Sequence, residues 1–346
     1  MSLRPVPDDL LPWALACLGK RATAADPVLS VVAGDASNRR YFRLTLPTDS
    51  YIVVEAPPAT ENNAAFLAIR DLLADAGVRV PALFGADMGR GYLLLEDLGD
   101  RLLLPELRAD TVDGQYRQAC SILRQLAALV PLGMDLPVYD EALLAEELGR
   151  FPAWFVTGLL ARSLDDAEQQ LVDGLFRVLI DSALEQPRVL VHRDFHSRNL
   201  MPQAAGGLAV IDFQDAVVGP VTYDLVSLLR DCYIRWPAAR VRNWALSYRD
   251  ELAAAGLLQG ADDAQFLRWF DWMGLQRHLK VLGTFARLHL RDGKPGYLDD
   301  LPRVLDYVRE VVQAYAPEYP VFADFGDWFD SGLGPLIEAQ PWSAAS

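Results

Sequence analysis

The chain has 346 residues, of which 51% are hydrophobic and 23% charged, as is ordinary for a soluble globular protein of one large or two moderate domains. Its formal net charge of −15 disfavours nucleic acid and anionic membranes as partners. The three cysteines show no metal-ligand spacing. The N-terminal segment, in which Asp8-Asp9 precede a short apolar stretch, does not resemble a signal peptide, and no apolar run reaches membrane-spanning length. We therefore expect a cytoplasmic protein with free thiols.

Residues 1–95 mix helical and extended patterns. The expected elements are helices at 9–19 and 59–76, and strands at 28–33, 40–46, 51–55, 81–84 and 92–95. This order predicts a separate small, β-rich N-lobe over residues 1–95. A polar break follows at 96–100, and we expect it to form a hinge.

Beyond the hinge, the apolar residues recur mostly at helical spacing. Helices are expected at 115–129, 140–155, 165–184, 221–233, 240–256, 263–282 and 298–315, and short strands at 189–191, 199–201 and 208–211. The tail from Pro317 is rich in aromatic residues, Gly and Pro, and we expect it to wrap the surface. The fold class is thus α+β and bilobal, with a larger helical C-lobe over 101–346.

Polar residues follow the short strands at fixed offsets. The segment VLVHRDFHSRNLM contains His192, Arg193, Asp194 and Asn199, and LAVIDFQDA contains Asp212. An H-R-D-x-x-x-x-N loop followed by a strand that ends in Asp-Phe is the layout of a kinase active site. We expect the strands to bring these ends together at one end of a sheet. Amide and carboxylate oxygens suit Mg²⁺, which predicts Asn199 and Asp212 as metal ligands and Asp194 as the catalytic base.

The lobes and motifs together resemble the aminoglycoside phosphotransferase and choline kinase family, which has a protein-kinase-like fold. The resemblance spans nearly the whole chain and is carried by GDASNRRYFRL, YIVVEAPP, HRDFHSRNLM, VIDFQDAVVGPVTYDLVSLLRD and GTFARLHLRDGKPGYL. It implies ATP and Mg²⁺ as cofactors. Within the family, the chain is similar to bacterial sugar kinases of cell-wall recycling. This similarity implies phosphorylation of the anomeric (C1) hydroxyl of N-acetylmuramic acid and N-acetylglucosamine. We expect the protein to be a monomer.

The resemblance also implies roles for residues around the active site. Asp224 is expected to accept backbone N–H bonds from the catalytic loop, and His192 to be a structural hydrogen-bonding residue. Gln214 replaces the glycine of Asp-Phe-Gly and should limit movement of this segment.

Nucleotide contacts are expected from the hinge and from a turn between the first strands. Backbone groups at Glu96 and Leu98 would meet the adenine. Gly34 and Ser37 lie where the glycine-rich phosphate cover stands in the family, although an ordinary hairpin turn is the alternative.

The third strand lacks the lysine that protein kinases use to hold the α- and β-phosphates. Arg39, Arg40 and Arg43 are the nearby cations that could replace it, with solvated surface arginines as the alternative. Alternation makes Arg43 the better candidate, because Phe42 and Leu44 look core-facing. Arg40 fits if the strand is bulged.

Sugar binding is expected just after the catalytic segment. Trp236 is the predicted stacking platform, although core packing explains most of the tryptophans. Asp215 and Asp231 are predicted to bind sugar hydroxyls, and a lactyl carboxylate requires a cation. The candidate cations are Arg198, Arg235, Arg277, Lys280 and Arg287. Other acceptors (an aminoglycoside, homoserine or choline) and a nucleotide-binding pseudokinase scaffold are the alternative functions.

Overall fold

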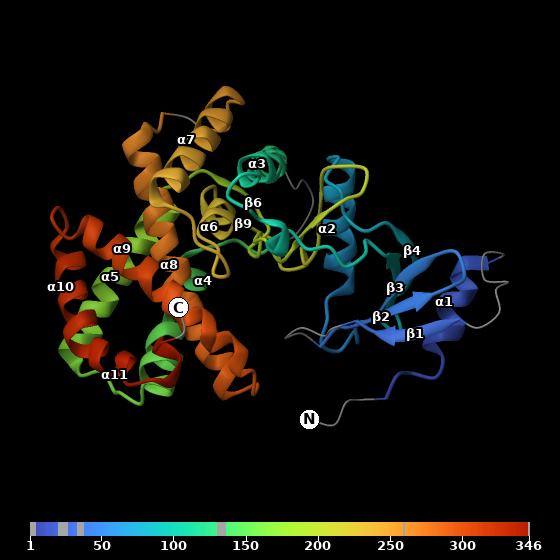
Figure 1. Ribbon diagram of the computed structural model, residues 1–346, viewed down its shortest axis with the longest axis horizontal. Helices are drawn as coiled ribbons and strands as arrows, with labels where there is room; N and C mark the ends of the chain where they lie inside the picture. The colour runs from blue at the N-terminus through green and yellow to red at the C-terminus, as the bar shows by residue number, and fades with distance from the viewer. Residues whose placement is uncertain (1–4, 20–26, 33–37, 130–135, 259, 345–346) are drawn as a thin grey trace. The chain divides into compact units, whose positions relative to one another are not determined.

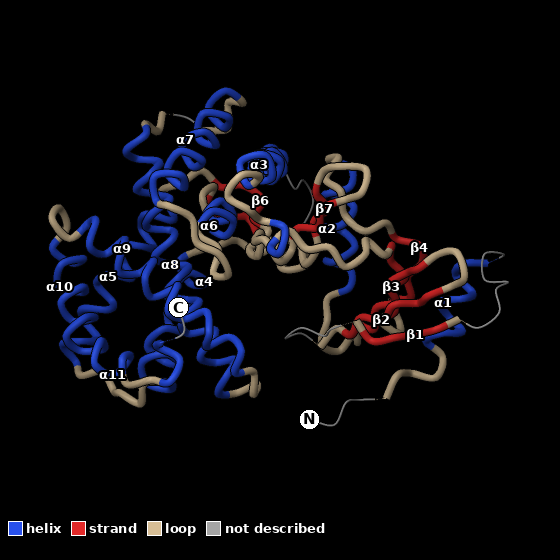
Figure 2. Tube along the Cα trace, viewed as in Figure 1, coloured by secondary structure: helices blue, strands red, loops and turns tan. Residues whose placement is uncertain are grey.

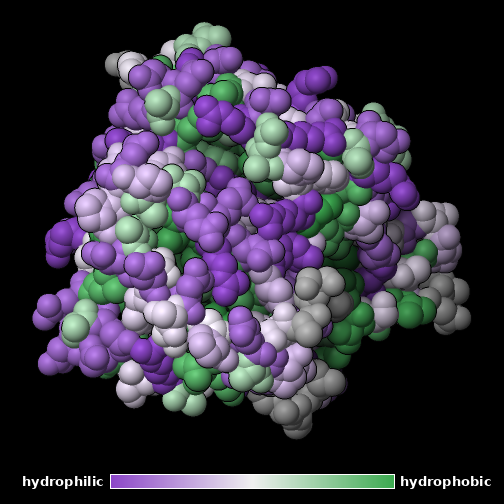
Figure 3. Space-filling model, turned by 60° about the vertical axis from the view of Figure 1, so that its left-hand side comes forward, coloured by the Kyte–Doolittle hydropathy of each residue, from purple (hydrophilic) through white to green (hydrophobic). Residues whose placement is uncertain are grey.

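The computed structural model describes residues 5–19, 27–32, 38–129, 136–258 and 260–344 (Figure 1). The chain forms two compact units, which are treated separately below. The N-terminal unit comprises Met1–Leu103 and Asn199–Asp215, and the C-terminal unit comprises Leu104–Arg198 and Ala216–Ser346. Within the described ranges, no helix combines the length and apolar character needed to cross a bilayer. Polar side chains cover most of the face seen in Figure 3, as expected from the large net charge.

The N-terminal unit is built on an antiparallel five-stranded sheet of order β1-β2-β3-β5-β4. Figure 1 shows α1 and α2 on opposite faces of this sheet. The strands are β1 Val28–Val31, β2 Arg40–Thr45, β3 Ser50–Glu55, β4 Leu83–Asp87 and β5 Tyr92–Glu96, and the helices are α1 Leu10–Leu18 and α2 Asn63–Asp75. Phe42 and Leu44 are buried in one cluster with α1, which confirms the predicted inward face of β2.

The hairpin of β7 (Leu200–Pro202) and β8 (Leu208–Val210) belongs to the N-terminal unit. The N–H of Val210 donates to the carbonyl of Arg79 at 2.8 Å, and the ring of Phe213 stacks on Phe66 at 5.0 Å. Sequence reasoning assigned this hairpin to the helical C-lobe and ended the first lobe at residue 95. The packing instead groups 199–215 with residues 1–103, because contacts between distant segments hold the hairpin there.

The C-terminal unit is mainly helical, as Figure 2 shows in blue, and α8 is its longest helix. Its helices are α3 Val112–Ala128, α4 Glu141–Arg150, α5 Asp166–Leu184, α6 Tyr223–Leu229, α7 Ala238–Ala254, α8 Asp263–Leu290, α9 Leu301–Tyr315, α10 Pro320–Trp328 and α11 Gly334–Glu338. Shorter helical turns are η2 Leu104–Glu106, η3 Phe151–Leu159, η4 Pro295–Asp300, η5 Phe329–Leu333 and η6 Pro341–Ala344.

Two predictions, one about the catalytic strands and one about the C-terminal tail, are wrong. The strand β6 (Arg188–Val191) pairs with β9 (Val217–Pro220), whereas β7 pairs with β8, so the catalytic strands form two ladders rather than one sheet. The tail after Pro317 does not wrap the surface. It forms α10, η5 and α11, and the side chains of Phe322 and Phe325 are fully buried because they complete the core around α5 and α9.

Replacing Gly283 by Ala should destabilise the protein. Gly283 lies inside α8, and a Cβ atom there would come within 2.2 Å of the carbonyl oxygen of Arg150. Backbone atoms cannot move aside as a flexible side chain can. We therefore expect the free energy of unfolding, measured in urea, to fall by about 1–3 kcal/mol. The gain in helix propensity, roughly 1 kcal/mol, does not offset it. The control is Gly114→Ala in α3, where a Cβ meets nothing within 4 Å and stability should stay equal or rise. Equal unfolding midpoints for Gly283→Ala and wild type would contradict the close approach.

Candidate active site

Asp194 follows β6 on a strained turn in the C-terminal unit. The preceding residue, Arg193, has a φ of 77°, a left-handed conformation that costs a non-glycine residue about 1–3 kcal/mol. The Asp224 carboxylate accepts the N–H of His192 at 2.6 Å and the N–H of Arg193 at 3.0 Å. The carbonyl of Arg193 accepts a bond from Nη1 of Arg277 at 3.1 Å. The strained peptide is thus held on both sides, and Asp224 makes the bonds expected of it.

A buried charge network lies beneath this turn. The Glu147 side chain is fully buried, and its carboxylate pairs with Arg193 and with Lys280, each at 2.7 Å. The hydroxyl of Tyr139 also donates to it. Burial raises the pKa of Glu147, but the positive charges of Lys280 and Arg193 lower it by more than burial raises it. The resulting pKa is about 2. Lys280 therefore neutralises a carboxylate of the protein, which argues against the predicted contact with a substrate carboxylate.

The Asp194 side chain is 45% exposed, and Nη2 of Arg277 lies 4.0 Å from its Oδ1. Partial burial raises the pKa of Asp194, but Arg277 and Lys280 lower it more, to about 2. The carboxylate is therefore ionised throughout the neutral range. A base this weak can orient a hydroxyl by a hydrogen bond and accept its proton late in the reaction.

His192 is a structural residue by its contacts. Only 2% of it is exposed, and its Nδ1 accepts the backbone N–H of Asp194 at 3.3 Å. Its ring meets the edge of Phe195 at a centroid distance of 5.8 Å. These contacts support the expected supporting role for His192 and leave Asp194 as the candidate base.

The predicted metal ligands lie together in the N-terminal unit. Nδ2 of Asn199 donates to Oδ2 of Asp212 at 3.3 Å, and Nε2 of Gln214 donates to Oδ1 at 2.7 Å. Asp212 also has a positive φ of 64°. Gln214, which replaces glycine in this motif, therefore restrains the Asp212 carboxylate. The expectation that Gln214 limits movement of this segment stays a prediction.

One carboxylate and one amide oxygen fit Mg²⁺, which prefers hard oxygen ligands and usually keeps waters and phosphate oxygens in its shell. Across the described residues, no group of three or more His, Cys, Asp or Glu side chains could hold a metal ion. A metal at Asn199 and Asp212 would thus take most of its ligands from substrate and water.

Arg40 and Arg43, the predicted phosphate cations, both pair with carboxylates of the N-terminal unit. Arg40 pairs with Glu55 on β3, and its Nη2 donates to the carbonyl of Pro5 at 3.0 Å. Arg43 pairs with Asp97 at 2.7 Å and with Asp100 at 2.8 Å. Arg43 is thus held by two carboxylates, and Arg40 by one carboxylate and a backbone carbonyl, and the contact of either with phosphate stays a prediction.

The hinge residues are partly exposed. Glu96 pairs with Arg79 and accepts the backbone N–H of Ala82 at 3.1 Å, while Leu98 is half-buried. Gly34 and Ser37 lie outside the described residues, so their expected role at the phosphates stays a prediction.

Asp231 is buried, with 1% exposed, and was predicted to bind a sugar hydroxyl. Its Oδ2 accepts the N–H of Ser197 at 2.9 Å as well as the Ser197 hydroxyl, and its Oδ1 accepts the N–H of Tyr233 at 3.0 Å. These bonds tie the catalytic loop to the segment after α6. The burial of Asp231 and these bonds show that it holds the loop, and its predicted contact with a sugar hydroxyl stays a prediction.

The predicted stacking residue, Trp236, packs in an aromatic cluster. Its indole N–H donates to the hydroxyl of Tyr116 at 3.0 Å, and its ring meets Trp244 edge-on at 6.1 Å. The indole N–H thus bonds within the protein, while the side chain is half-buried, and its stacking on a sugar stays a prediction. Arg198 and Asp215 are exposed, and the guanidinium of Arg198 lies 4.5 Å from the ring centre of Tyr233. Both remain predicted substrate contacts.

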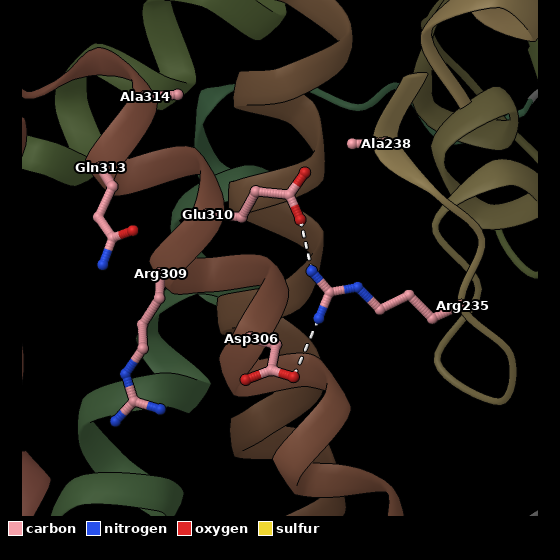
Figure 4. Close-up of a pocket in the computed structure, with 7 residues that line it drawn as sticks. All are labelled: Arg235, Ala238, Asp306, Arg309, Glu310, Gln313 and Ala314. Carbon is pink, nitrogen blue, oxygen red and sulfur yellow. Dashed lines mark hydrogen bonds and ion pairs between the residues drawn. The ribbon is translucent and has the colours of Figure 1, made fainter. Parts of the chain in front are cut away.

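Arg235, a candidate for a substrate carboxylate, is engaged by α9. Figure 4 shows its guanidinium between Asp306, at 2.9 Å, and Glu310, at 2.7 Å. The three residues border an open groove of about 820 Å³. The other lining residues are Ala238, Arg309, Gln313 and Ala314. The paired carboxylates make this groove a poor site for an anion.

Sequence reasoning did not find Glu147. Leu144 and Leu148, also in α4, are fully buried, so Glu147 occupies the apolar face of its helix. A carboxylate on an apolar helix face requires a buried cation as its partner. The position of Glu147 between apolar residues of the helix was the feature of the sequence that could have indicated a buried ion pair. The identity of the cations, Arg193 and Lys280, depends on packing between distant segments.

Turnover should fall as the pH drops through about 7, because the Asp224 carboxyl then gains a proton. Burial raises the pKa of Asp224 to about 7, despite the backbone bonds from His192 and Arg193, which lower it. A protonated carboxyl has one acceptor less for those N–H groups, whereas Asp194 stays ionised. We expect this acid limb in kcat to be absent from Asp224→Asn, which should be slower at every pH, by about tenfold.

Unfolding supplies the second measurement for Asp224. A carboxyl whose pKa is raised by folding contributes stability below its unfolded pKa, and this contribution is lost as the pH rises through about 7. Relative to wild type, Asp224→Asn should therefore gain stability between pH 4 and pH 8 in urea unfolding. An identical acid limb in both proteins would contradict the assignment.

The sequence is similar to known phosphotransferases. A profile of the phosphotransferase enzyme family matches residues 28–270. The N-acetylmuramate/N-acetylglucosamine kinase of Pseudomonas putida is 46% identical over 284 residues, 82% of this chain and 83% of that protein. The kinase of the same name from Neisseria meningitidis is 40% identical, over 85% of this chain and 89% of that protein.

Solved structures share the fold at low sequence identity. The ADP-bound aminoglycoside phosphotransferase APH(2'')-Ib aligns with a TM-score of 0.58 at 14% identity, over 88% of this chain and 99% of that chain. These similarities confirm the predicted resemblance and the predicted α+β, protein-kinase-like fold class.

Proposed function

Since this chain belongs to the phosphotransferase enzyme family, we propose that it is an ATP-dependent kinase for the anomeric hydroxyl of N-acetylmuramic acid and N-acetylglucosamine. The observation that carries the proposal is identity of 46% and 40%, over more than four fifths of the chain, to kinases named for these two sugars. An H-R-D-x-x-x-x-N loop with an ionised Asp194 supports it. We place the reaction in peptidoglycan recycling, in the cytoplasm, and expect a monomer.

Each part of the site has a role in this proposal. Asp194 orients the C1 hydroxyl and accepts its proton as the γ-phosphoryl group is transferred. Asn199 and Asp212 hold Mg²⁺, which when bound supplies positive charge to the phosphate oxygens. Gln214 restrains Asp212, and Asp224 holds the strained turn that presents Asp194. Backbone groups of residues 96–98 meet the adenine.

Two further residues are proposed to contact the sugar. Arg198 and Asp215 are exposed and lie at the ends of the catalytic segments, one just before Asn199 and the other just after Gln214. A guanidinium suits a lactyl carboxylate, and a carboxylate suits sugar hydroxyls. Arg198→Gln should therefore raise the KM for N-acetylmuramic acid more than the KM for N-acetylglucosamine, which has no carboxylate.

The experiment is a coupled ADP-release assay with Mg-ATP on a panel of acceptors. The panel contains both amino sugars, the 1-O-methyl glycoside of N-acetylglucosamine, an aminoglycoside, homoserine and choline. We expect turnover with the two free sugars and none with the methyl glycoside, whose anomeric oxygen is blocked. Turnover with the methyl glycoside would exclude the C1 hydroxyl as the acceptor. Turnover only with another acceptor would exclude the sugar assignment, and no turnover with any would favour the scaffold.

A further inference from the structure

The kinase proposed above requires a cation for the nucleotide phosphates, and β3 carries only Glu55 as a charged residue. Glu55 pairs with Arg40 directly across the β2–β3 ladder. The same ladder pairs Phe42 with Val53, and both are buried against α1. Since cross-strand partners share a face, Arg40 and Glu55 lie on the α1 face of the sheet, opposite α2. A bulge that would turn Arg40 to the other face is not present.

Arg39 lies on the α2 face. It precedes Arg40 by one residue, so strand alternation turns it to the opposite side. Its Nε donates to Oε2 of Glu61, just before α2, at 2.8 Å, and its guanidinium carbon lies 4.8 Å from the ring centre of Phe66 on α2. The side chain is buried, with 2% exposed. A carboxylate and an aromatic face therefore fix the orientation of a buried cation in this position.

The same contacts connect Arg39 with the metal-binding segment. Phe66, beneath the Arg39 guanidinium, stacks on Phe213 at 5.0 Å, and Phe213 directly follows Asp212 in the sequence. All four residues belong to the N-terminal unit, so this chain of contacts lies within one compact unit. It places a buried arginine on the side of the sheet that carries the predicted Mg²⁺ ligand.

We propose that Arg39, held by Glu61, replaces the absent strand lysine and binds the α- and β-phosphates of ATP. A guanidinium offers parallel N–H donors that match phosphate oxygens, which a lysine ammonium cannot do. The proposal rests on the kinase function. It selects Arg39 from the three candidate arginines of the sequence, among which strand alternation favours Arg43 and a bulge would favour Arg40. Glu61 is a positioning residue in this arrangement, because it acts through Arg39.

The test compares binding of Mg-ATP and of adenosine to the full chain by calorimetry. Because only ATP carries phosphates, Arg39→Gln should raise the Kd for ATP by about 10- to 100-fold and leave the Kd for adenosine within about twofold. Arg90→Gln is the matched control. Like Arg39, Arg90 pairs with carboxylates, those of Asp9 and Asp87, and its guanidinium lies over an aromatic ring, that of Tyr92, at 5.2 Å. In Arg90→Gln, the Kd values for ATP and for adenosine should both stay unchanged.

An unchanged Kd for ATP in a folded Arg39→Gln protein would overturn the proposal. If this variant fails to fold, Arg39→Lys keeps the charge, and its Kd for ATP should rise by about 3- to 10-fold with adenosine unaffected. Equal ATP binding by Arg39→Lys and wild type would then overturn it. If Arg39→Gln weakens ATP binding but the wild-type protein phosphorylates neither sugar, the proposed substrate is refuted and the role of Arg39 stands. If the wild-type protein phosphorylates the sugars but Arg39→Gln binds ATP as tightly as wild type, the role of Arg39 is refuted and the proposed substrate stands.

Discussion

Asp194→Asn should lower kcat by about 10³-fold and leave the Kd for Mg-ATP within about twofold of the wild-type value. Asn has the shape of Asp but cannot accept the proton of the sugar hydroxyl, and it lacks the negative charge that faces Arg277. The bonds that hold the strained turn come from backbone groups of His192 and Arg193, so the fold should persist. Single-turnover kinetics and calorimetry with Mg-ATP measure the two effects separately.

The control for this variant is Asp173→Asn. Asp173 is an exposed residue of α5 that accepts a bond from Gln169, and its substitution should leave kcat unchanged. A kcat of Asp194→Asn above about one tenth of the wild-type value would remove Asp194 as the base, because general-base catalysis contributes at least about 10²-fold.

Asp212→Asn should raise the Mg²⁺ concentration for half-maximal turnover by at least about tenfold and lower kcat by about 10³-fold. The substitution removes the negative charge that would attract Mg²⁺. Asp212 has a φ of 64°, and Asn is among the few non-glycine residues that tolerate this region. The backbone should therefore keep its conformation, which separates loss of the metal from loss of the fold.

Turnover as a function of Mg²⁺ concentration, together with urea unfolding, measures both effects of this substitution. The free energies of unfolding should agree within about 1 kcal/mol, because the half-buried side chain keeps its shape and loses at most one of its two hydrogen bonds. Half-maximal turnover at the wild-type Mg²⁺ concentration, with more than half of kcat retained, would exclude Asp212 as a metal ligand.

Many of the elements follow from local patterns in the sequence. The alternation at Phe42 and Leu44 predicts the inward face of β2, and helical spacing predicts α8, although it continues to Leu290, eight residues beyond its predicted end. The order of strands and helices, with the motifs, also predicts the fold class that the comparisons confirm. Local patterns fail at β9, where Gly219 and Pro220 look like a break although both residues lie in the ladder with β6.

The sequence by itself determined the reaction class, because the residues around Asp194 and Asp212 stand at short fixed offsets that local backbone geometry preserves. Only the tertiary structure decided which polar side chains bind other groups of the protein. Asp231 accepts bonds from a residue 34 positions away, and Arg43 pairs with carboxylates 54 and 57 positions away. The energy of a buried charge depends on its neighbours in space, and the folded chain brings those neighbours from distant segments. Local periodicity therefore predicts helices, strands and motifs, whereas the assignment of cations such as Arg39 requires the packed structure.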